Sequence, residues 1–174
     1  SKQSCELFIE SFQKRFDLDF TILRYGSLYG PRSDESNWIH SIIDQALKHK
    51  KIIRKGDGEE IREYIHVIDA ARLTARMIGD EFKNQYMIIT GQQTMRIRDV
   101  LVMIKEMLGN NIELKFIDEE NEEHYAVTPY NFKPRFAKKI TNNTYVDFGQ
   151  GILELINQQF DRSQEKSSSS IERI

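Results

Sequence analysis

The pattern of apolar and polar residues switches between helical and extended periods along most of the chain. The opening segment has one apolar stripe at helical spacing, formed by Cys5, Phe8, Ile9, Phe12 and Phe16. The stretch FTILR at 20–24 is mostly apolar and rich in strand-forming residues. It leads into YGSLYGPR, where glycine and proline stop regular structure. The sequence therefore begins with a predicted amphipathic helix, a strand and a loop.

The same alternation continues downstream. Helical spacing predicts helices over 37–49, 70–82, 97–108 and 152–160, and apolar runs predict strands over 86–90 and 112–118. Two short strands are expected on either side of a Gly-Asp-Gly turn at 56–58. Residues 119–145, which hold two of the three prolines, read as irregular. Alternating helices and strands predict an α/β fold with parallel strands joined by helical crossovers.

Length and composition predict a single folded region. A chain of 174 residues can bury one core, and we expect that core to use residues 1–160. The last stretch, RSQEKSSSSIERI, has little to bury, so 161–174 is predicted to be a disordered tail.

The charge, the cysteine content and the length of the apolar runs indicate which classes of protein this chain does not fit. The 25 basic and 27 acidic residues nearly cancel and are interspersed, which argues against a nucleic-acid-binding module. Cys5, the single cysteine, lies on the apolar stripe and is expected to be a buried residue in a reducing compartment. The apolar runs are too short to span a membrane, and no signal peptide opens the chain. These features predict a cytoplasmic protein without membrane contact.

Four stretches, in this order and spacing, resemble the second half of the extended short-chain dehydrogenase/reductase family. This group includes NAD-dependent nucleotide-sugar epimerases and dehydratases, such as UDP-glucose 4-epimerase. The stretches are the Ser1, Lys2 and Glu6 pattern, LRYGSLYGPR at 23–32, GDGEEIREYIHVID at 56–69 and YMIITGQQTMRIRDVL at 86–101. The resemblance implies the C-terminal part of a Rossmann-like doubly wound parallel sheet, together with a smaller α/β substrate-binding lobe.

The opening residues resemble the second half of the family motif Tyr-x-x-Ser-Lys-x-x-x-Glu. Its Tyr would lie three residues before Ser1, and the glycine-rich dinucleotide fingerprint that the family carries near its N-terminus is not in this sequence. The resemblance therefore implies a fragment of a longer enzyme. Lys2 would be catalytic and would hold the NAD ribose. An ammonium one helical turn from a phenol favours the phenolate, which can then act as a base. For Lys2 taken alone, a solvated surface lysine is the alternative.

The second stretch implies two more ligand contacts. Tyr25 would lie near the nicotinamide of NAD, and Ser27 would contact cofactor and substrate. The family usually has Asn where Ser27 stands, and a serine offers fewer hydrogen bonds than an amide. Tyr29 would shape the turn or pack in the core.

The third stretch implies the substrate-phosphate contact. Arg62 would grip the nucleotide diphosphate, because a guanidinium presents paired donors to phosphate oxygens. The alternative is a surface arginine paired with Glu60 or Glu63. His66 is expected either to pack beside a hinge or to contact the ligand, and Asp69 to cap the following helix.

Further along, Arg135 or Lys133 stands where many relatives have an arginine that closes on the substrate phosphates. His124 and the other histidines lie on different predicted elements, which argues against a metal site. No Gly-x-Ser-x-Gly turn is present to hold a serine nucleophile.

The leading hypothesis is epimerisation of a nucleotide-diphosphate sugar through a keto sugar, with NAD as cofactor, by a longer homodimeric enzyme. A 4,6-dehydratase or reductase of the same family is the alternative within the resemblance. A hypothesis of another class is a non-catalytic module that binds a nucleotide sugar or a partner. We also expect the strands at 20–24 and 86–90 to leave an open sheet edge and exposed apolar surface.

Overall fold

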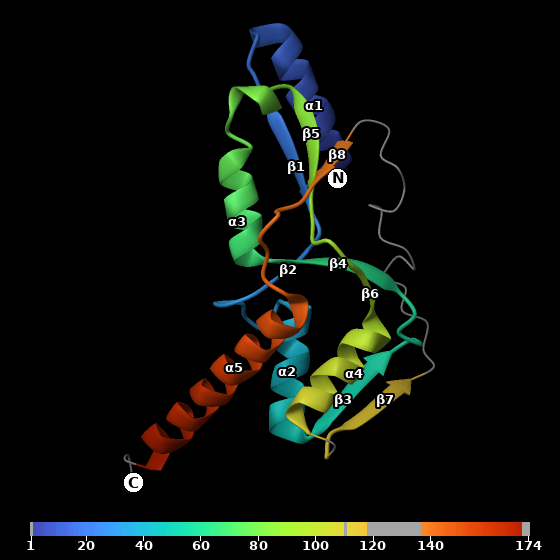
Figure 1. Ribbon diagram of the computed structural model, residues 1–174, viewed down its shortest axis with the longest axis vertical. Coiled ribbons are helices and arrows are strands. Elements are labelled where there is room, and N and C mark those ends of the chain that lie inside the picture. The colour runs from blue at the N-terminus through green and yellow to red at the C-terminus, as the bar shows by residue number, and fades with distance from the viewer. Residues whose placement is uncertain (1, 110, 118–136, 172–174) are drawn as a thin grey trace.

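Helices and strands alternate along the chain in the computed structural model, which describes residues 2–109, 111–117 and 137–171 (Figure 1). The helices are α1 (Lys2–Phe16), α2 (Trp38–His49), α3 (Val67–Arg76), the short 3-10 helix η1 (Asp80–Phe82), α4 (Ile97–Leu108) and α5 (Phe148–Ile171). The strands are β1 (Thr21–Tyr25), β2 (Ser27–Tyr29), β3 (Lys51–Lys55), β4 (Ile61–His66), β5 (Gln85–Ile89), β6 (Thr94–Arg96), β7 (Glu113–Ile117) and β8 (Ala137–Ile140).

The described strands form three small sheets with mostly parallel pairing. The first has the order β1-β5-β8, and all its strands are parallel. In the second, β2 pairs with β4 in parallel and β6 joins β4 antiparallel. The third pairs β3 with β7 in parallel. This arrangement confirms the α/β class with parallel strands.

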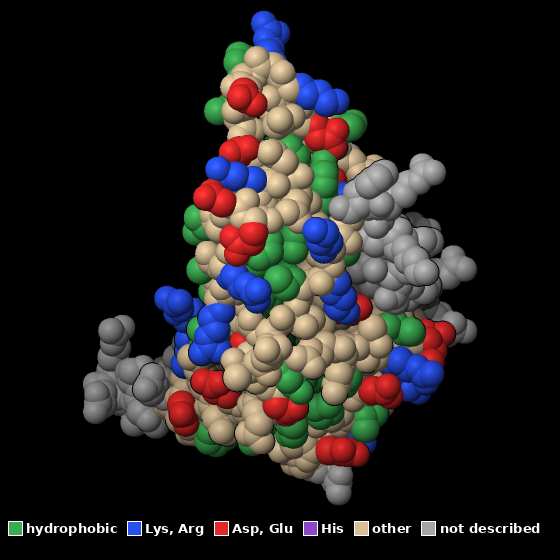
Figure 2. All heavy atoms as spheres, turned by 45° about the horizontal axis from the view of Figure 1, so that its top comes forward, with side chains coloured by type: hydrophobic (Ala, Val, Ile, Leu, Met, Phe, Trp, Pro, Cys, Tyr) green, Lys and Arg blue, Asp and Glu red, His purple; other side chains and the backbone are tan. Residues whose placement is uncertain are grey.

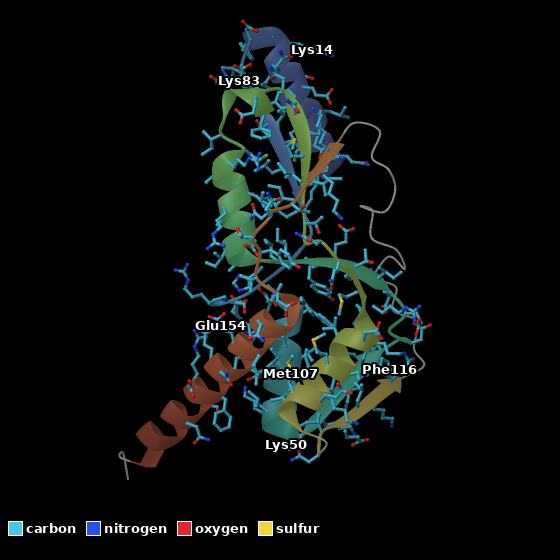
Figure 3. All side chains as sticks on the ribbon, in the orientation of Figure 1. Lys14, Lys50, Lys83, Met107, Phe116 and Glu154 are labelled. Atoms are coloured by element: carbon cyan, nitrogen blue, oxygen red, sulfur yellow. The ribbon has the colours of Figure 1, made fainter. Side chains whose placement is uncertain are left out.

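The described residues form two apolar cores, one toward each end of the molecule in Figure 1. The smaller core packs α3 against the first sheet, with Leu73, Met87 and Ile89 at its centre. The larger core gathers α2, α4 and α5 around β3, and includes Ile43 and Ile104, both fully buried. Between the two ends, β2 and β4 cross the middle of the molecule (Figure 1). Lys14 and Lys83 mark the end with the first sheet, and Lys50 marks the other (Figure 3).

Burial pattern explains why the predicted helices and strands form. In α2 and α4 the buried residues recur at helical spacing, as the sequence pattern predicts. Asn37 caps α2 by accepting a hydrogen bond from the His40 backbone N–H at 3.2 Å. Gly109 follows α4 at φ 100°, a backbone conformation that a side chain disfavours. The start of α2 and the end of α4 therefore agree with the sequence prediction.

The opening helix differs from its prediction in one respect. None of its residues is buried, and Cys5 is exposed, so the expectation that Cys5 is buried is wrong. The apolar stripe of α1 faces outward, with Phe8 68% and Phe12 55% exposed. The helix contacts the first sheet through the polar side chains of Glu6 and Glu10 instead.

Several other boundaries also differ. The strands flanking the Gly-Asp-Gly turn, β3 and β4, join different sheets rather than each other. Strand β8 lies within the stretch predicted to be irregular. It was not predicted because its AKKI sequence has too few apolar residues to indicate a strand. The predicted helix over 70–82 is α3 followed by a turn and η1. Helix α5 continues to Ile171, through most of the predicted tail, and no glycine or proline interrupts 161–171.

The open-edge expectation holds for one of the two strands. Within the described residues, β1 pairs with β5 on one side and with nothing on the other, whereas β5 has β1 and β8 on its two sides. On the face shown in Figure 2, acidic and basic side chains are interspersed and no field of one sign dominates. None of the helices in the described ranges combines the length and apolar character that a bilayer span requires.

Candidate functional site

A tight passage from β1 into β2 positions the first candidate residue, Ser27. The backbone N–H of Gly26 donates to the Ile89 carbonyl at 2.9 Å. A Cβ at Gly26 would lie 2.5 Å from Thr90 Oγ1 and 2.8 Å from the Glu63 carbonyl oxygen, so a glycine is needed for the backbones to approach this closely. Ser27 then pairs in register with Tyr64 of β4.

Ser27 opens onto a pocket of about 140 Å³ that we call the arginine pocket. Its lining comes from β2, the start of α2, β3, β4 and the start of α4. The lining residues are Ser27, Leu28, Asn37, Trp38, Ile39, Arg54, Arg62, Tyr64 and Ile97. Among these described residues are two arginines and no aspartate or glutamate, so the pocket is suited to an anion.

The beginning of α2 adds to this electropositive character. Asn37 and Trp38, its N-cap and first residue, both line the pocket. The Asn37 amide also donates to the Leu28 carbonyl at 2.8 Å, which fixes the start of α2 beside β2. The backbone N–H groups at a helix start carry a partial positive charge and bind phosphate groups well.

Arg62 lies on β4 with its guanidinium at this pocket. Its Nη1 donates to the Ile61 carbonyl at 2.9 Å. Within the described part of the chain, its acidic neighbours bind elsewhere: Glu60 pairs with Arg54 at 2.8 Å, and Glu63 with Lys139 at 3.0 Å. The alternative in which Arg62 pairs with one of these glutamates is therefore wrong.

Arg54, the second arginine of the pocket, was not predicted from the sequence as a site residue. In β3, buried and exposed residues alternate, and Arg54 shares the buried face with Ile52 and is 8% exposed. The signal that could have found it is this alternation, since a charged residue in register with a buried isoleucine needs a partner. The phenol of Tyr64 lies close to both arginines. Burial raises the pKa of Tyr64, and the charges of Arg62 and Arg54 act in the opposite direction.

Lys2 lies outside the arginine pocket, at the start of α1. Two contacts fix the direction of this helix relative to the first sheet. Glu6 accepts hydrogen bonds from Arg24 near the end of β1, and one turn later Glu10 accepts from Tyr86 near the start of β5. Helix α1 therefore runs opposite to these strands, and Lys2, one turn before Glu6, lies toward their carboxyl ends. Ligands of open α/β sheets bind outside the carboxyl ends of the strands.

Tyr25 contacts α3, and its proximity to the nicotinamide stays a prediction. Its ring packs against the smaller core, and its hydroxyl lies 2.6 Å from Thr74 Oγ1 on α3. The structure thus brings Ser27 and Arg62 together, and it places Tyr25 and Lys2 elsewhere. Arg135 and Lys133 lie outside the described residues, as does His124.

His66 and Asp69 border a second, smaller pocket of about 40 Å³. His66 is the N-cap of α3 and accepts a hydrogen bond from Ile68 through Nδ1 at 3.3 Å. The expectation that Asp69 caps this helix is wrong, because its carboxylate accepts from the Val146 backbone N–H at 2.7 Å instead. Burial lowers the pKa of His66, and the nearby Asp69 opposes that shift.

Tyr29 is a core residue rather than an exposed ligand contact. It is 2% exposed and packs edge-to-face on His66, with 5.2 Å between the ring centroids. Within the described residues, no group of three or more His, Cys, Asp or Glu side chains is placed to hold a metal ion. The arginine pocket is therefore the candidate binding site.

Strand β1 of the parallel sheet ends two residues before Ser27, which lines the arginine pocket, and a ligand pocket after the carboxyl end of a parallel strand is typical of nucleotide-binding α/β proteins. The sequence model of the NAD dependent epimerase/dehydratase family matches residues 1–89. That match covers half of the chain, and the chain belongs to this family.

Individual relatives agree with this assignment. The "Putative UDP-glucose 4-epimerase" of Methanocaldococcus jannaschii is 27% identical over 161 residues, which are 90% of this chain and 51% of that relative. The structure of UDP-N-acetylglucosamine 4-epimerase from Methanobrevibacter ruminantium superposes with a TM-score of 0.74 at 24% identity, covering 92% of this chain and 52% of that one. The structure of dTDP-glucose 4,6-dehydratase from Bacillus anthracis, solved with NAD, superposes with a TM-score of 0.72 at 20% identity. The superposition covers 93% of this chain and 51% of that one.

The solved structures establish the fold as the Rossmann-like α/β fold of these enzymes. The chain spans about half the length of the relatives and solved structures described above.

Proposed function

We propose that this chain is the substrate-binding half of a longer NAD-dependent enzyme that epimerises a nucleotide-diphosphate sugar through a keto sugar. The observation that carries this proposal is the arginine pocket. Two guanidinium groups and a helix start converge there, and no carboxylate lines it among the described residues. That combination suits a diphosphate.

The roles within the pocket follow from its geometry. Arg62 has a guanidinium that no described carboxylate neutralises, so it would hold the substrate diphosphate. Ser27 would donate one hydrogen bond from the opposite strand of the same sheet. Arg135 is proposed as a further phosphate contact from the resemblance alone, because it lies outside the described residues.

Lys2 is proposed as the catalytic lysine and as a cofactor contact. Two observations support this role: Lys2 is exposed, and it lies toward the carboxyl ends of the first sheet's strands, where an open sheet binds its ligands. Bound NAD would accept the hydride that leaves the sugar. Lys2 would favour the phenolate form of a tyrosine one turn earlier on the same helix and hold the ribose. Tyr25 is proposed to lie near the nicotinamide from the resemblance alone, with its hydroxyl paired with Thr74.

Elimination of water by a 4,6-dehydratase is a second candidate, favoured by the likeness to dTDP-glucose 4,6-dehydratase structures. Both reactions begin with the same oxidation and use the same binding lobe. The residues of this chain suit epimerisation and dehydration equally well, so the two reactions have to be distinguished by their products.

The outward-facing stripe of α1 supports homodimerisation of the longer protein. Leu7, Phe8, Phe12 and Phe16 are each more than half exposed, and they lie on a helix whose polar residues contact the sheet. An apolar stripe of this kind is typical of an association surface. We also propose the cytoplasm as the place of action, since the single cysteine fits a reducing compartment.

Product analysis of the full-length protein tests the proposed function. The protein, loaded with NAD, is incubated with UDP-, dTDP- and GDP-sugars, and the products are identified by mass spectrometry and NMR. An epimerase gives a product of unchanged mass and altered stereochemistry, whereas a dehydratase gives a keto sugar lighter by one water. Binding without turnover of any sugar would refute both and support a non-catalytic module.

A further inference from the structure

A buried ion pair between Arg54 and Glu60 stands beside the arginine pocket. Arg54 Nη2 lies 2.8 Å from Glu60 Oε1, and the two side chains are 9% and 12% exposed. Arg54 lines the pocket, and Glu60 does not. Of the two members of the ion pair, the arginine therefore borders the pocket.

The hydrogen bonding of this pair is incomplete within the described residues. Arg54 Nε and Glu60 Oε2 are buried there without a partner. A guanidinium has five N–H donors, and one of them is used by Glu60. A buried ion pair offsets its desolvation cost well when its remaining donors and acceptors are also satisfied. A ligand oxygen in the pocket can accept a hydrogen bond from an N–H group of Arg54 that Glu60 does not use.

The position of Arg54 relative to Arg62 indicates what kind of ligand that is. Both arginines line one pocket of about 140 Å³, and the charges of both act on the phenol of Tyr64, which lines the same pocket. Asn37 and Trp38 bring the positive end of α2 to the same space. Two planar cations suit two linked anionic groups better than one, because each can pair with its own phosphate.

We propose that Arg54 is a second anion contact, which makes the arginine pocket select nucleoside diphosphates over monophosphates, and that Glu60 is the positioning residue that holds Arg54 toward the ligand. This inference rests on the proposed function, since it assigns a further specificity-determining residue to the same substrate site. Arg62 holds one phosphate group and Arg54 the other. Glu60 fixes the guanidinium from behind, so that Arg54 does not fold back onto the protein.

Isothermal titration calorimetry on the full-length protein tests this assignment. The probes are UDP, dTDP and GDP with their monophosphates, and the pair of the base that binds best is used throughout. The variants are R54M and the double variant R54M/E60M, which replaces the ion pair by apolar residues of similar volume and so leaves no buried charge unpaired. R96M is the matched control, because Arg96 is an exposed arginine on β6 outside the pocket lining. Thermal unfolding confirms that each variant folds.

We expect R54M/E60M to bind the diphosphate roughly tenfold or more weakly than wild type, with a much smaller loss for the monophosphate. The preference for diphosphate then falls, while R96M binds both probes like wild type. A folded R54M/E60M with unchanged affinity for both probes would overturn the role of Arg54 and leave the proposed function standing. A wild-type protein that binds no nucleoside diphosphate would overturn the proposed function and this inference together.

Discussion

Glu6 of α1 and Arg24 of β1 form a two-point hydrogen bond, from Arg24 Nε at 2.9 Å and from Nη2 at 2.6 Å. The guanidinium of Arg24 also lies over the ring of Tyr86, 5.3 Å from its centroid. Since α1 buries no apolar residue within the described chain, these polar contacts determine how the helix sits on the sheet. They therefore also determine where Lys2 lies.

We expect E6Q to lower the free energy of unfolding by about 1 kcal/mol, because it removes one charge from a partly buried two-point pair. Urea denaturation measures the change, and amide hydrogen exchange should show faster exchange in α1. K83M is the control, since Lys83 pairs with Asp19 and Asp80 at the surface. Equal stability of E6Q and wild type would show that α1 is held by something else.

Gly26→Ala tests the close passage between β1 and β2. A methyl group there would meet Thr90 Oγ1 and the Glu63 carbonyl, so the backbone has to shift. We expect a loss of about 1–3 kcal/mol in the free energy of unfolding, together with weaker substrate binding through the displaced Ser27. Gly149→Ala, at the start of α5, is the control and should change stability far less, because its nearest neighbour is a side-chain oxygen, Asp147 Oδ1, at 3.2 Å. A fully stable Gly26→Ala protein would contradict the geometry described for this passage.

His66 should make the protein less stable in acid. Burial lowers the pKa of His66 from its ordinary value of 6.5, with Asp69 and Glu154 acting in the opposite direction. Below pH 6.5, His66 binds a proton in the unfolded chain but stays neutral in the folded chain. The free energy of unfolding therefore falls as the pH falls toward the lowered pKa. Above about pH 7.5 this contribution is fully present.

H66N is the variant for this test, because asparagine also accepts a hydrogen bond at a helix N-cap but carries no charge. Urea denaturation at about pH 7.5 and about pH 5.5 should show a smaller acid loss in H66N than in wild type. H49N, at the exposed end of α2, controls for the removal of a histidine. An acid loss in H66N as large as that of wild type would contradict a buried, neutral His66.

Arg62→Met should mainly weaken substrate binding in the full-length protein. Loss of a charge-assisted phosphate contact predicts a KM raised about tenfold or more, with kcat changed far less, since the contact exists before and during the reaction. Initial rates over a range of substrate concentrations measure both constants, with R96M again as control. Unchanged KM in R62M would refute the role assigned to Arg62.

Most of the fold was accessible from the sequence because its apolar periodicity is strong where elements are buried. The stripes of α2 and α4 predicted helices whose buried residues the structure confirms. The prediction failed for strands that form through backbone hydrogen bonds to a neighbouring strand rather than through burial of apolar residues. Strand β8 and the three-residue strands β2 and β6 have little apolar signal and exist through hydrogen bonds to neighbouring strands.

The site was predictable to the extent that it resembles a known pattern. Ser27 and Arg62 were proposed from separate stretches, and the structure brings them into one pocket. The alternation along β3 could have shown that Arg54 is buried, but its pairing with Glu60 depends on where β3 and β4 lie in space, which spacing along the chain does not reveal. Burial of Cys5 was wrongly expected, because a helical stripe does not show whether it faces the core or solvent.

Replacement of Lys2 in the full-length protein tests the central claim most directly. Turnover of the best nucleotide sugar is measured for wild type, K2M and the control K14M, which removes a lysine from the far end of the same helix (Figure 3). The account predicts that K2M loses a factor of about 10² to 10⁴ in kcat while it still binds nucleoside diphosphate in the arginine pocket, and that K14M behaves like wild type. Wild-type turnover in K2M would contradict it.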